Sequence, residues 1–252
     1  MRFTLPKPTW RRSLSIIAVS ALIIVISFVL WANSTNPIDA SARAALEDSA
    51  QVDVSQGAYL SFMPKEANPR VGYILYPGGR VLAEAYAPIA HAIAEQGYFV
   101  AIVYAPLNLA FFNVSAANAV IAEHPEIEAW AVGGHSLGGV AATLFADSQA
   151  DKVRGLVIMA SFPANGNLAQ RNDLQVVSIY GTEDGLASVE NILASADDLP
   201  AGTRFVAIEG GNHAQFGAYG AQSGDKPASI SAQDQLEQIV SASTELLASL
   251  EP

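Results

Sequence analysis

The sequence predicts one α/β domain, with a mostly parallel sheet and helices on both faces, preceded by a single transmembrane helix. From residue 58 onward, short β-branched or aromatic runs alternate with longer helical patterns, which is typical of parallel βαβ units. Before this region, twenty uncharged residues separate Arg12 from Asn33. Of the 252 residues, about 220 follow that run, which is a normal size for one domain.

The composition excludes several classes of protein. Hydrophobic residues make up 51% of the chain and charged residues 15%, so we expect a compact fold with a sizeable core. The absence of cysteine excludes disulfides, thiol nucleophiles and cysteine metal sites. The net charge is −11, and all 24 acidic residues follow residue 33. Because such a surface repels phosphate backbones, we expect no nucleic-acid partner.

The apolar run at residues 13–32 is long enough, as a helix, to cross a bilayer. Basic residues within 1–12 and Trp31 at the far end predict a cytoplasmic N-terminus, a signal anchor and a domain on the extracytoplasmic side. A cleaved signal peptide, giving a secreted protein, and a buried core helix are the alternatives. The run exceeds the usual apolar length of a signal peptide, and no small-x-small site directly follows it.

A polar, alanine-rich stretch at residues 33–51 predicts a spacer, which places the α/β domain at residues 52–252. We expect strands at residues 58–62, 70–76, 98–104, 129–133, 153–160, 175–180 and 204–208. We expect helices at residues 83–96, 115–123, 137–146, 188–196 and 232–250. The last helix begins with a capping box, Ser231 and Asp234, and carries a row of leucine, isoleucine and valine side chains along one face.

A G-x-S-x-G motif lies where a short apolar strand runs into a helix, at Gly134-His135-Ser136-Leu137-Gly138. A serine on such a tight turn stands clear of the sheet, and the helix N-terminus favours developing negative charge. Glycines at both ends of the motif remove side chains that would clash there. A glycine-rich turn with an incidental serine is the plainer interpretation. The strand-to-helix context favours Ser136 as a nucleophile.

A serine nucleophile needs a histidine base from elsewhere in the fold. His91 lies in an amphipathic helical pattern and His124 at a helix end, so both are expected to have packing or surface roles. His135 adjoins the serine on the elbow and should point away from it. His213 follows a late predicted strand in a glycine-rich loop, at the strand end where ligands usually bind. We therefore predict His213 as the base.

The acid should fall between the serine and the histidine in the chain. Asp184 follows a predicted strand in the segment Tyr180-Gly181-Thr182-Glu183-Asp184-Gly185 and meets that order. Its neighbour Glu183 is not excluded by the sequence, and Asp184-Gly185 is also an ordinary turn dipeptide. The order of the three residues, each at a strand end, predicts a triad of Ser136, Asp184 and His213.

Acyl transfer also requires two backbone N–H groups directed at the oxyanion. The amide of Leu137 should be one of them. The other should come from the loop Pro77-Gly78-Gly79-Arg80, where Gly79 or Arg80 could donate. Apolar residues in the neighbouring loops predict a pocket for an apolar acyl or alcohol group: Leu107, Phe111, Phe112, Phe162 and Phe216. Only about fifteen residues separate Ala160 from Gln175, so we expect no large lid.

These segments together resemble the α/β-hydrolase superfamily, in particular its bacterial fold-5 family, which is distantly similar to dienelactone hydrolases. The resemblance rests on YPGGRV, APLNLAFF, GGHSLGGVAA, IYGTEDG and GGNHAQFGAYGAQSGD. It implies an α/β-hydrolase fold and the same three triad residues. Dienelactone hydrolases usually carry a cysteine nucleophile, and this chain has none. The family implies a hydrolase site without naming a substrate.

The predicted function is therefore ester hydrolysis of a small molecule through an acyl-enzyme. A cell-envelope acyltransferase with the same triad and a non-catalytic binding protein with the same fold are the alternatives. Metal clusters, dinucleotide fingerprints and phosphate loops are absent from the sequence, so no cofactor is expected. The sequence does not predict an oligomeric state.

Overall fold

The computed structural model describes residues 10–251, and of Arg11 and Arg12 only the backbone. The chain divides into two units, Met1–Ser34 and Thr35–Pro252, which are described separately. The predicted cytoplasmic segment at residues 1–12 lies outside the described residues, except where the first helix begins.

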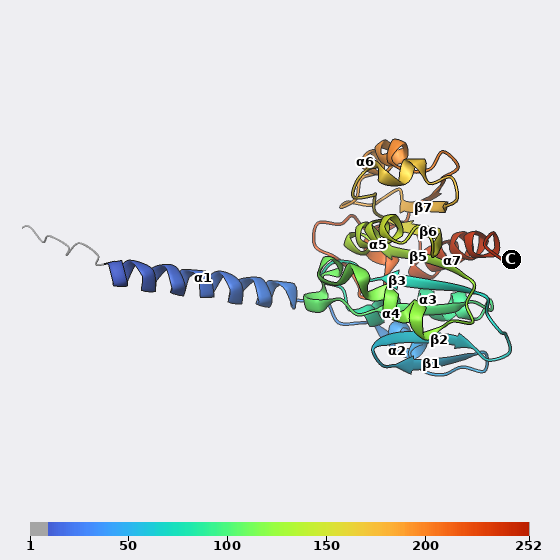
Figure 1. Cartoon of the computed structure of the whole chain (residues 1–252), viewed down its shortest axis with the longest axis horizontal. Helices are drawn as coiled ribbons and strands as arrows, with labels where there is room; N and C mark the ends of the chain where they lie inside the picture. Colours follow the sequence, from blue (N-terminus) through green and yellow to red (C-terminus); the bar gives the residue numbers. More distant parts are fainter. Residues whose placement is uncertain (1–9, 252) are drawn as a thin grey trace, which may run out of the picture. The chain divides into compact units, whose positions relative to one another are not determined.

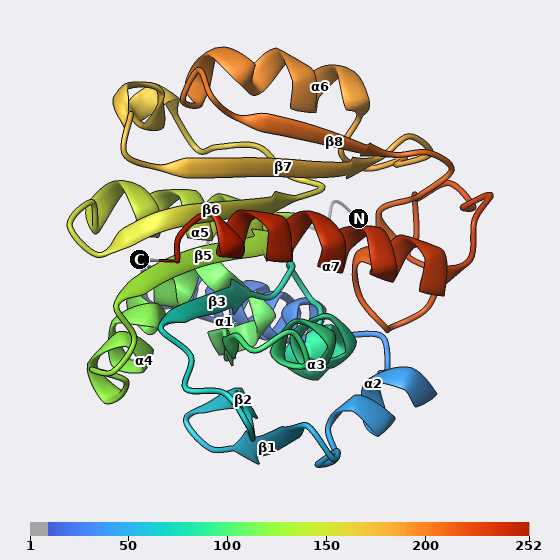
Figure 2. The same ribbon diagram turned by 90° about the vertical axis from the view of Figure 1, so that its right-hand side faces the viewer.

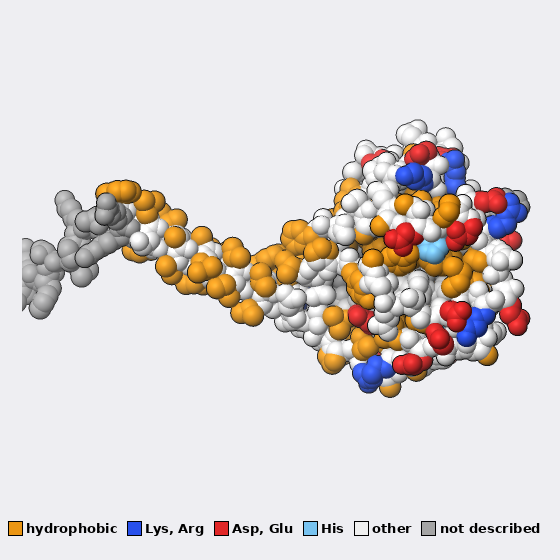
Figure 3. Space-filling view, turned by 60° about the horizontal axis from the view of Figure 1, so that its bottom comes forward, with side chains coloured by type: hydrophobic (Ala, Val, Ile, Leu, Met, Phe, Trp, Pro, Cys, Tyr) orange, Lys and Arg blue, Asp and Glu red, His pale blue; other side chains and the backbone are white. Residues whose placement is uncertain are grey.

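The first unit consists of the helix α1, Trp10–Ala32. Its segment Ser13–Ala32 has a mean hydropathy of 2.8 and is long and apolar enough to cross a membrane. Apolar side chains cover it along its length (Figure 3). Within the part of the chain that the structure describes, this is the one helix with that length and composition. A signal sequence near an N-terminus has the same properties.

The second unit is built on an eight-stranded sheet with the order β1-β2-β4-β3-β5-β6-β7-β8 (Figure 1). β1 and β2 pair in antiparallel fashion, as do β2 and β4, and all other neighbours are parallel. The strands are β1 Val52–Gln56, β2 Tyr59–Pro64, β3 Val71–Tyr76, β4 Phe99–Val103, β5 Ala129–His135, β6 Val153–Met159, β7 Gln175–Gly181 and β8 Arg204–Ile208. The sequence analysis missed β1, an edge strand in which three of five residues are exposed.

Helices cover both faces of the sheet, as predicted. They are α2 Ala40–Ala45, α3 Ala87–Ala94, α4 Ala117–Glu123, α5 Leu137–Ser148, α6 Val189–Ala194 and α7 Ala232–Ala248, and short 3-10 turns join several of them. Figure 2 shows α3 and α7 on one face of the sheet and α5 behind it. Because the strands β3 to β8 are parallel, their carboxyl ends lie at the same edge of the sheet, between the two helical layers.

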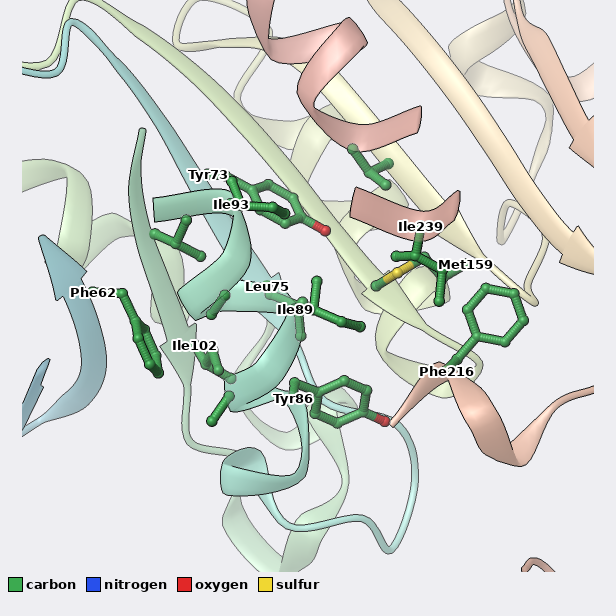
Figure 4. Close-up of a cluster of buried hydrophobic side chains, with 14 of the residues drawn as sticks. Phe62, Tyr73, Leu75, Tyr86, Ile89, Ile93, Ile102, Met159, Phe216 and Ile239 are labelled. Carbon is green, nitrogen blue, oxygen red and sulfur yellow. The ribbon is translucent and has the colours of Figure 1, made fainter. Parts of the chain in front are cut away.

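The alternation of side chains along β3 supplies both halves of the core. Tyr73 and Leu75 pack with α3 and α7, whereas Ile74 and Tyr76 pack on the face that α4 and α5 cover. Each of these four side chains is fully buried (Figure 4 shows the first face). Burial of such a side chain stabilises a fold by about 1.5–3 kcal/mol, so this strand is a main source of the domain's stability.

The helix α7 begins as the sequence predicted. The Ser231 hydroxyl accepts from the Asp234 amide, and the Asp234 carboxylate accepts from the Ser231 amide, which completes the capping box. Of the predicted apolar face, Ile239, Leu246 and Leu247 are buried. This packing fixes α7 against the sheet beside the loop that follows β8.

The expected spacer at residues 33–51 is wrong for most of its length, because residues from Thr35 onward belong to the folded domain. The Asn36 side chain donates to the Ala221 carbonyl at 2.9 Å, and the Asp39 amide donates to the Ala218 carbonyl at 3.0 Å. Asp39 also caps α2, in which Ala42 is fully buried. Hydrogen bonds and the few apolar side chains present, including Ile38 and Leu46, hold this segment against the domain, so its shortage of large apolar residues was a misleading signal.

Candidate active site

The motif around Ser136 forms a sharp turn between β5 and α5. Ser136 has φ 51° and ψ −121°, a strained conformation for a residue with a side chain, which costs on the order of 1–3 kcal/mol. Its amide donates to the Met159 carbonyl at 2.9 Å, and its carbonyl accepts from the Ser161 hydroxyl at 2.7 Å. These bonds hold the serine in the conformation that an exposed nucleophile requires.

The close approach of Gly134 and Gly138 explains why the turn needs glycine at these positions. A Cβ atom on Gly134 would collide with the backbone of Gly138, and one on Gly138 would collide with the carbonyls of Tyr76 and Pro77. Backbone atoms have nowhere to move in so tight a turn. The start of α5 is thereby packed directly against the end of β3 and the loop that follows it.

His213 and Asp184 are joined by a buried hydrogen bond. The distance from His213 Nδ1 to Asp184 Oδ2 is 2.8 Å, and the two side chains are 2% and 0% exposed. The other carboxylate oxygen, Oδ1, accepts from the amides of Leu186 and Ala187, both at 2.7 Å. A carboxylate held in this way can orient an imidazole and leave its Nε2 available as a base. The structure gives this partner to Asp184 and not to Glu183.

The other three histidines have different surroundings. His91 Nδ1 pairs with the Ala45 carbonyl at 2.9 Å, and His124 pairs with Tyr59 and Glu126. Their partners are consistent with the packing or surface roles expected for both. His135 is buried directly against His213, with ring centroids 4.4 Å apart.

This contact brings the elbow and the histidine loop together, because His135 is the residue before Ser136. Among the described residues, no hydrogen bond joins Ser136 to the His213 ring, and Ser136 is half-buried. Nucleophile–base bonds are often long or poorly aligned without substrate. The predicted nucleophile and the predicted base thus both adjoin His135, Ser136 through the chain and His213 through its ring.

The hydrogen bonds of the backbone amides reduce the number of candidates for the predicted oxyanion donors. The Arg80 amide donates to the Asn108 carbonyl at 2.7 Å, so it is engaged and the prediction of Arg80 as a donor is wrong. Gly79 is adjacent to the elbow, since a Cβ atom there would lie 3.0 Å from Leu137 Cδ2. Leu137 is the first residue of α5, where amides have no partner within the helix. Gly79 and Leu137 remain as the predicted oxyanion donors.

The predicted pocket residues divide into two groups. Phe111, Phe112 and Phe162 are 45%, 56% and 42% exposed, and Leu107 is half-buried with φ 55°. Leu107, Phe111 and Phe112 lie in 3-10 turns that follow β4, and Phe162 lies in the loop after β6. The prediction of Phe216 as a substrate contact is wrong, because it is fully buried and stacks on His135. Between β6 and β7 only the 3-10 turn Gly166–Gln170 is present, so this connection forms no helical lid.

Two side chains that the sequence analysis missed hold the histidine loop in place. Asp225 accepts from the Gly185 amide with one oxygen and from the Ala214 amide with the other, both at 2.9 Å, so it ties the acid loop to the base loop. Gln235 of α7 is fully buried and bonds to both the amide and the carbonyl of Asn212. Local sequence patterns could not identify Asp225 and Gln235, because the groups that they bind lie 11 to 40 residues away in the chain.

A cavity of about 490 Å³ borders the histidine loop. It is lined by residues of α2, α3, α7 and the loop itself, including Asp39, Ile89, Gln215 and Leu236. Ser136 is not among them, so this cavity is separate from the elbow. Within the described residues, no group of three His, Cys, Asp or Glu side chains could hold a metal ion.

Comparisons with known proteins agree with the fold. The profile described as the alpha/beta hydrolase family matches residues 72–237, which include Ser136, Asp184 and His213. Similar solved structures include the esterase domain of a Rhodothermus marinus protein, with a TM-score of 0.59, 13% identity, and coverage of 77% of this chain and 97% of that one.

Est1E from Butyrivibrio proteoclasticus with ferulic acid bound gives a TM-score of 0.60 at 13% identity, covering 80% of this chain and 98% of that one. TT1662 from Thermus thermophilus gives a TM-score of 0.51 at 14% identity, and the match covers 65% of this chain and 91% of that one. Likeness at such identities shows the fold alone. No curated protein matches this chain.

Proposed function

Since the chain belongs to the alpha/beta hydrolase family, we propose that it is a serine hydrolase that cleaves carboxylic esters of small molecules through an acyl-enzyme. The observation that carries this proposal is the buried bond between His213 and Asp184, next to an elbow that holds Ser136 at a positive φ. A catalytic base requires such a partner, because the imidazolium that forms during the reaction must be stabilised.

In the proposed reaction, Ser136 Oγ attacks the ester carbonyl carbon while His213 Nε2 takes the hydroxyl proton. The carbonyl oxygen becomes an oxyanion, which accepts from the amides of Leu137 and Gly79. The C–O bond to the alcohol then breaks, and His213 returns the proton to the departing oxygen. Water, activated by the same histidine, attacks the acyl-enzyme and releases the acid. Asp184 keeps the imidazole in one orientation throughout.

The substrate is proposed to be an ester with an apolar or aromatic group of moderate size. Support comes from the exposed rings of Phe111, Phe112 and Phe162, which lie in the connections that follow β4 and β6. Large apolar side chains that are exposed near catalytic residues commonly contact the substrate. The related fold of Est1E binds ferulic acid, an aromatic carboxylic acid, which is consistent with this class.

We expect short esters to be hydrolysed at least as fast as long ones. Each methylene removed from water contributes about 0.8 kcal/mol, and an open site without a lid removes few of them beyond the first carbons. The measurement is kcat/KM of the full chain in detergent for p-nitrophenyl esters of increasing acyl length, with the free acid identified as product. A steady rise in kcat/KM beyond about eight carbons would instead require a deep apolar tunnel.

Residues 13–32 are proposed to anchor the protein, with the domain on the extracytoplasmic side. The support is the length and hydropathy of that segment, with basic residues before it. We expect the protein to stay in the membrane fraction after alkaline carbonate washing and to keep its N-terminal segment in intact mass measurement. A soluble mature chain starting near Arg43 would contradict the anchor and indicate a cleaved signal.

A further inference from the structure

The side chain of Tyr86 links two parts of the candidate site that are far apart in the sequence. Its hydroxyl accepts from the Gly78 amide at 2.9 Å and pairs with His135 Nδ1 at 2.8 Å. Tyr86 is fully buried, and Figure 4 shows its ring on the same side of the sheet as Phe216. Gly78 adjoins Gly79, the proposed oxyanion donor. His135 adjoins Ser136 and lies against the ring of the proposed base.

Hydrogen-bond accounting sets the direction of these bonds. The Tyr86 hydroxyl oxygen receives the Gly78 N–H, so its own proton is free to be donated to His135 Nδ1. In this arrangement Nδ1 accepts and the proton of the neutral ring lies on Nε2, for which the structure gives no hydrogen-bond partner among the described residues. Burial lowers the pKa of His135 well below 6.5, and the nearby His213 lowers it further, so the ring remains neutral. Burial likewise raises the pKa of Tyr86 well above 10, which keeps the hydroxyl protonated.

His135 is held firmly in this position. One face of its ring stacks on Phe216, with centroids 5.6 Å apart and the planes within 12°. It also contacts the His213 ring, at 4.4 Å and 51°. Space around the pair is tight, because a Cβ atom on Gly78 would lie 2.8 Å from the Tyr86 hydroxyl and 2.9 Å from His135 Nδ1. The His213 imidazole is therefore bounded by His135 as well as by its bond to Asp184.

We propose that Tyr86 and His135 form a positioning pair, which orients the His213 ring and the Gly78-Gly79 amides together. Neither member of the pair forms or breaks a bond in the proposed reaction. Its role is to keep the base and one oxyanion donor in register with Ser136, because errors of about 1 Å at such groups reduce rates by up to about a hundredfold. This inference rests on the proposed function and adds two residues to it.

Tyr86→Phe tests the pair by removing a single oxygen atom. We expect kcat for a short p-nitrophenyl ester to fall by about 10- to 100-fold with KM unchanged, since the geometry of the reacting groups and not the substrate contacts is altered. Tyr73→Phe is the matched control. It removes another buried tyrosine hydroxyl, one that has no hydrogen-bond partner among the described residues. We expect it to leave kcat at the wild-type value.

A double-mutant cycle separates positioning from general destabilisation. His135→Gln removes the other member of the pair. Because the two residues are proposed to act as a unit, we expect the kcat of the double variant to be no lower than the kcat of the less active single variant. His135→Gln also replaces Tyr86→Phe in the kinetic test if the latter does not melt cooperatively. Equal kcat in Tyr86→Phe and Tyr73→Phe, or losses that simply add, would overturn the proposal.

The wild-type protein is first treated with a fluorophosphonate probe, and the labelled peptide is identified. Failure to label Ser136 would overturn the proposed function, and with it the basis of the pair. Labelling of Ser136 together with unchanged kinetics in Tyr86→Phe would overturn the pair alone.

Discussion

Ser136→Ala is expected to abolish covalent labelling by a fluorophosphonate and to reduce ester hydrolysis by at least about 10⁴-fold. The reason is that no other group replaces the attacking oxygen, while the oxyanion donors and the pocket retain only a residual effect. Alanine has the same backbone constraint as serine at φ 51°, so thermal stability should change little. The measurement combines intact mass spectrometry of the labelled protein with steady-state kinetics.

Ser161→Ala is the matched control for this experiment. Ser161 is a buried serine whose hydroxyl donates to the Ser136 carbonyl, so it lies beside the nucleophile. Loss of that bond should cost roughly 1 kcal/mol of stability and leave the probe site intact. Persistent labelling of Ser136→Ala, or loss of labelling only in Ser161→Ala, would show that Ser136 is not the nucleophile.

Asp184→Asn is expected to reduce kcat by about 10⁴-fold with the fold preserved. The amide NH₂ facing His213 Nδ1 would donate a hydrogen bond, which stabilises the tautomer with its proton on Nε2 and leaves no base for Ser136. In the opposite orientation, the NH₂ group would face the amides of Leu186 and Ala187 and lose both of their bonds. Steady-state kinetics and a thermal melt distinguish these effects.

Glu183→Gln supplies the comparison, because Glu183 is the neighbouring carboxylate that the sequence did not exclude. It should retain kcat near the wild-type value, since the structure places Asp184 Oδ2 at 2.8 Å from His213. The assignment of the acid fails if Glu183→Gln inactivates the protein and Asp184→Asn does not.

Features carried by a short stretch of chain were predictable from the sequence. The parallel strands β3 to β8 were found because each is a brief apolar run bounded by turn residues. The elbow at Ser136 was found because two glycines and a strand-to-helix boundary occur within five residues. The capping box of α7 was found for the same reason, since both of its partners lie in one turn.

Other features depended on residues that only the folded chain brings together. Phe216 was expected in the pocket from its position after His213, yet the ring turns into the core and stacks on His135. The Arg80 amide was expected to be available, but the Asn108 carbonyl accepts from it. Neither outcome is determined by local residue preferences, because each depends on a contact with a segment elsewhere in the chain.

The sequence by itself determined the order Ser136, Asp184 and His213, the positions of the parallel strands and the apolar segment at residues 13–32. These follow from local spacing and hydropathy, which operate within one strand, turn or helix. Only the tertiary structure decided that Asp184 is the partner of His213, that Asp225 joins their loops, and that Tyr86 reaches His135 across 49 residues. Hydrogen bonds of this kind form where packing brings distant side chains within about 3 Å, and that distance is set by the whole fold.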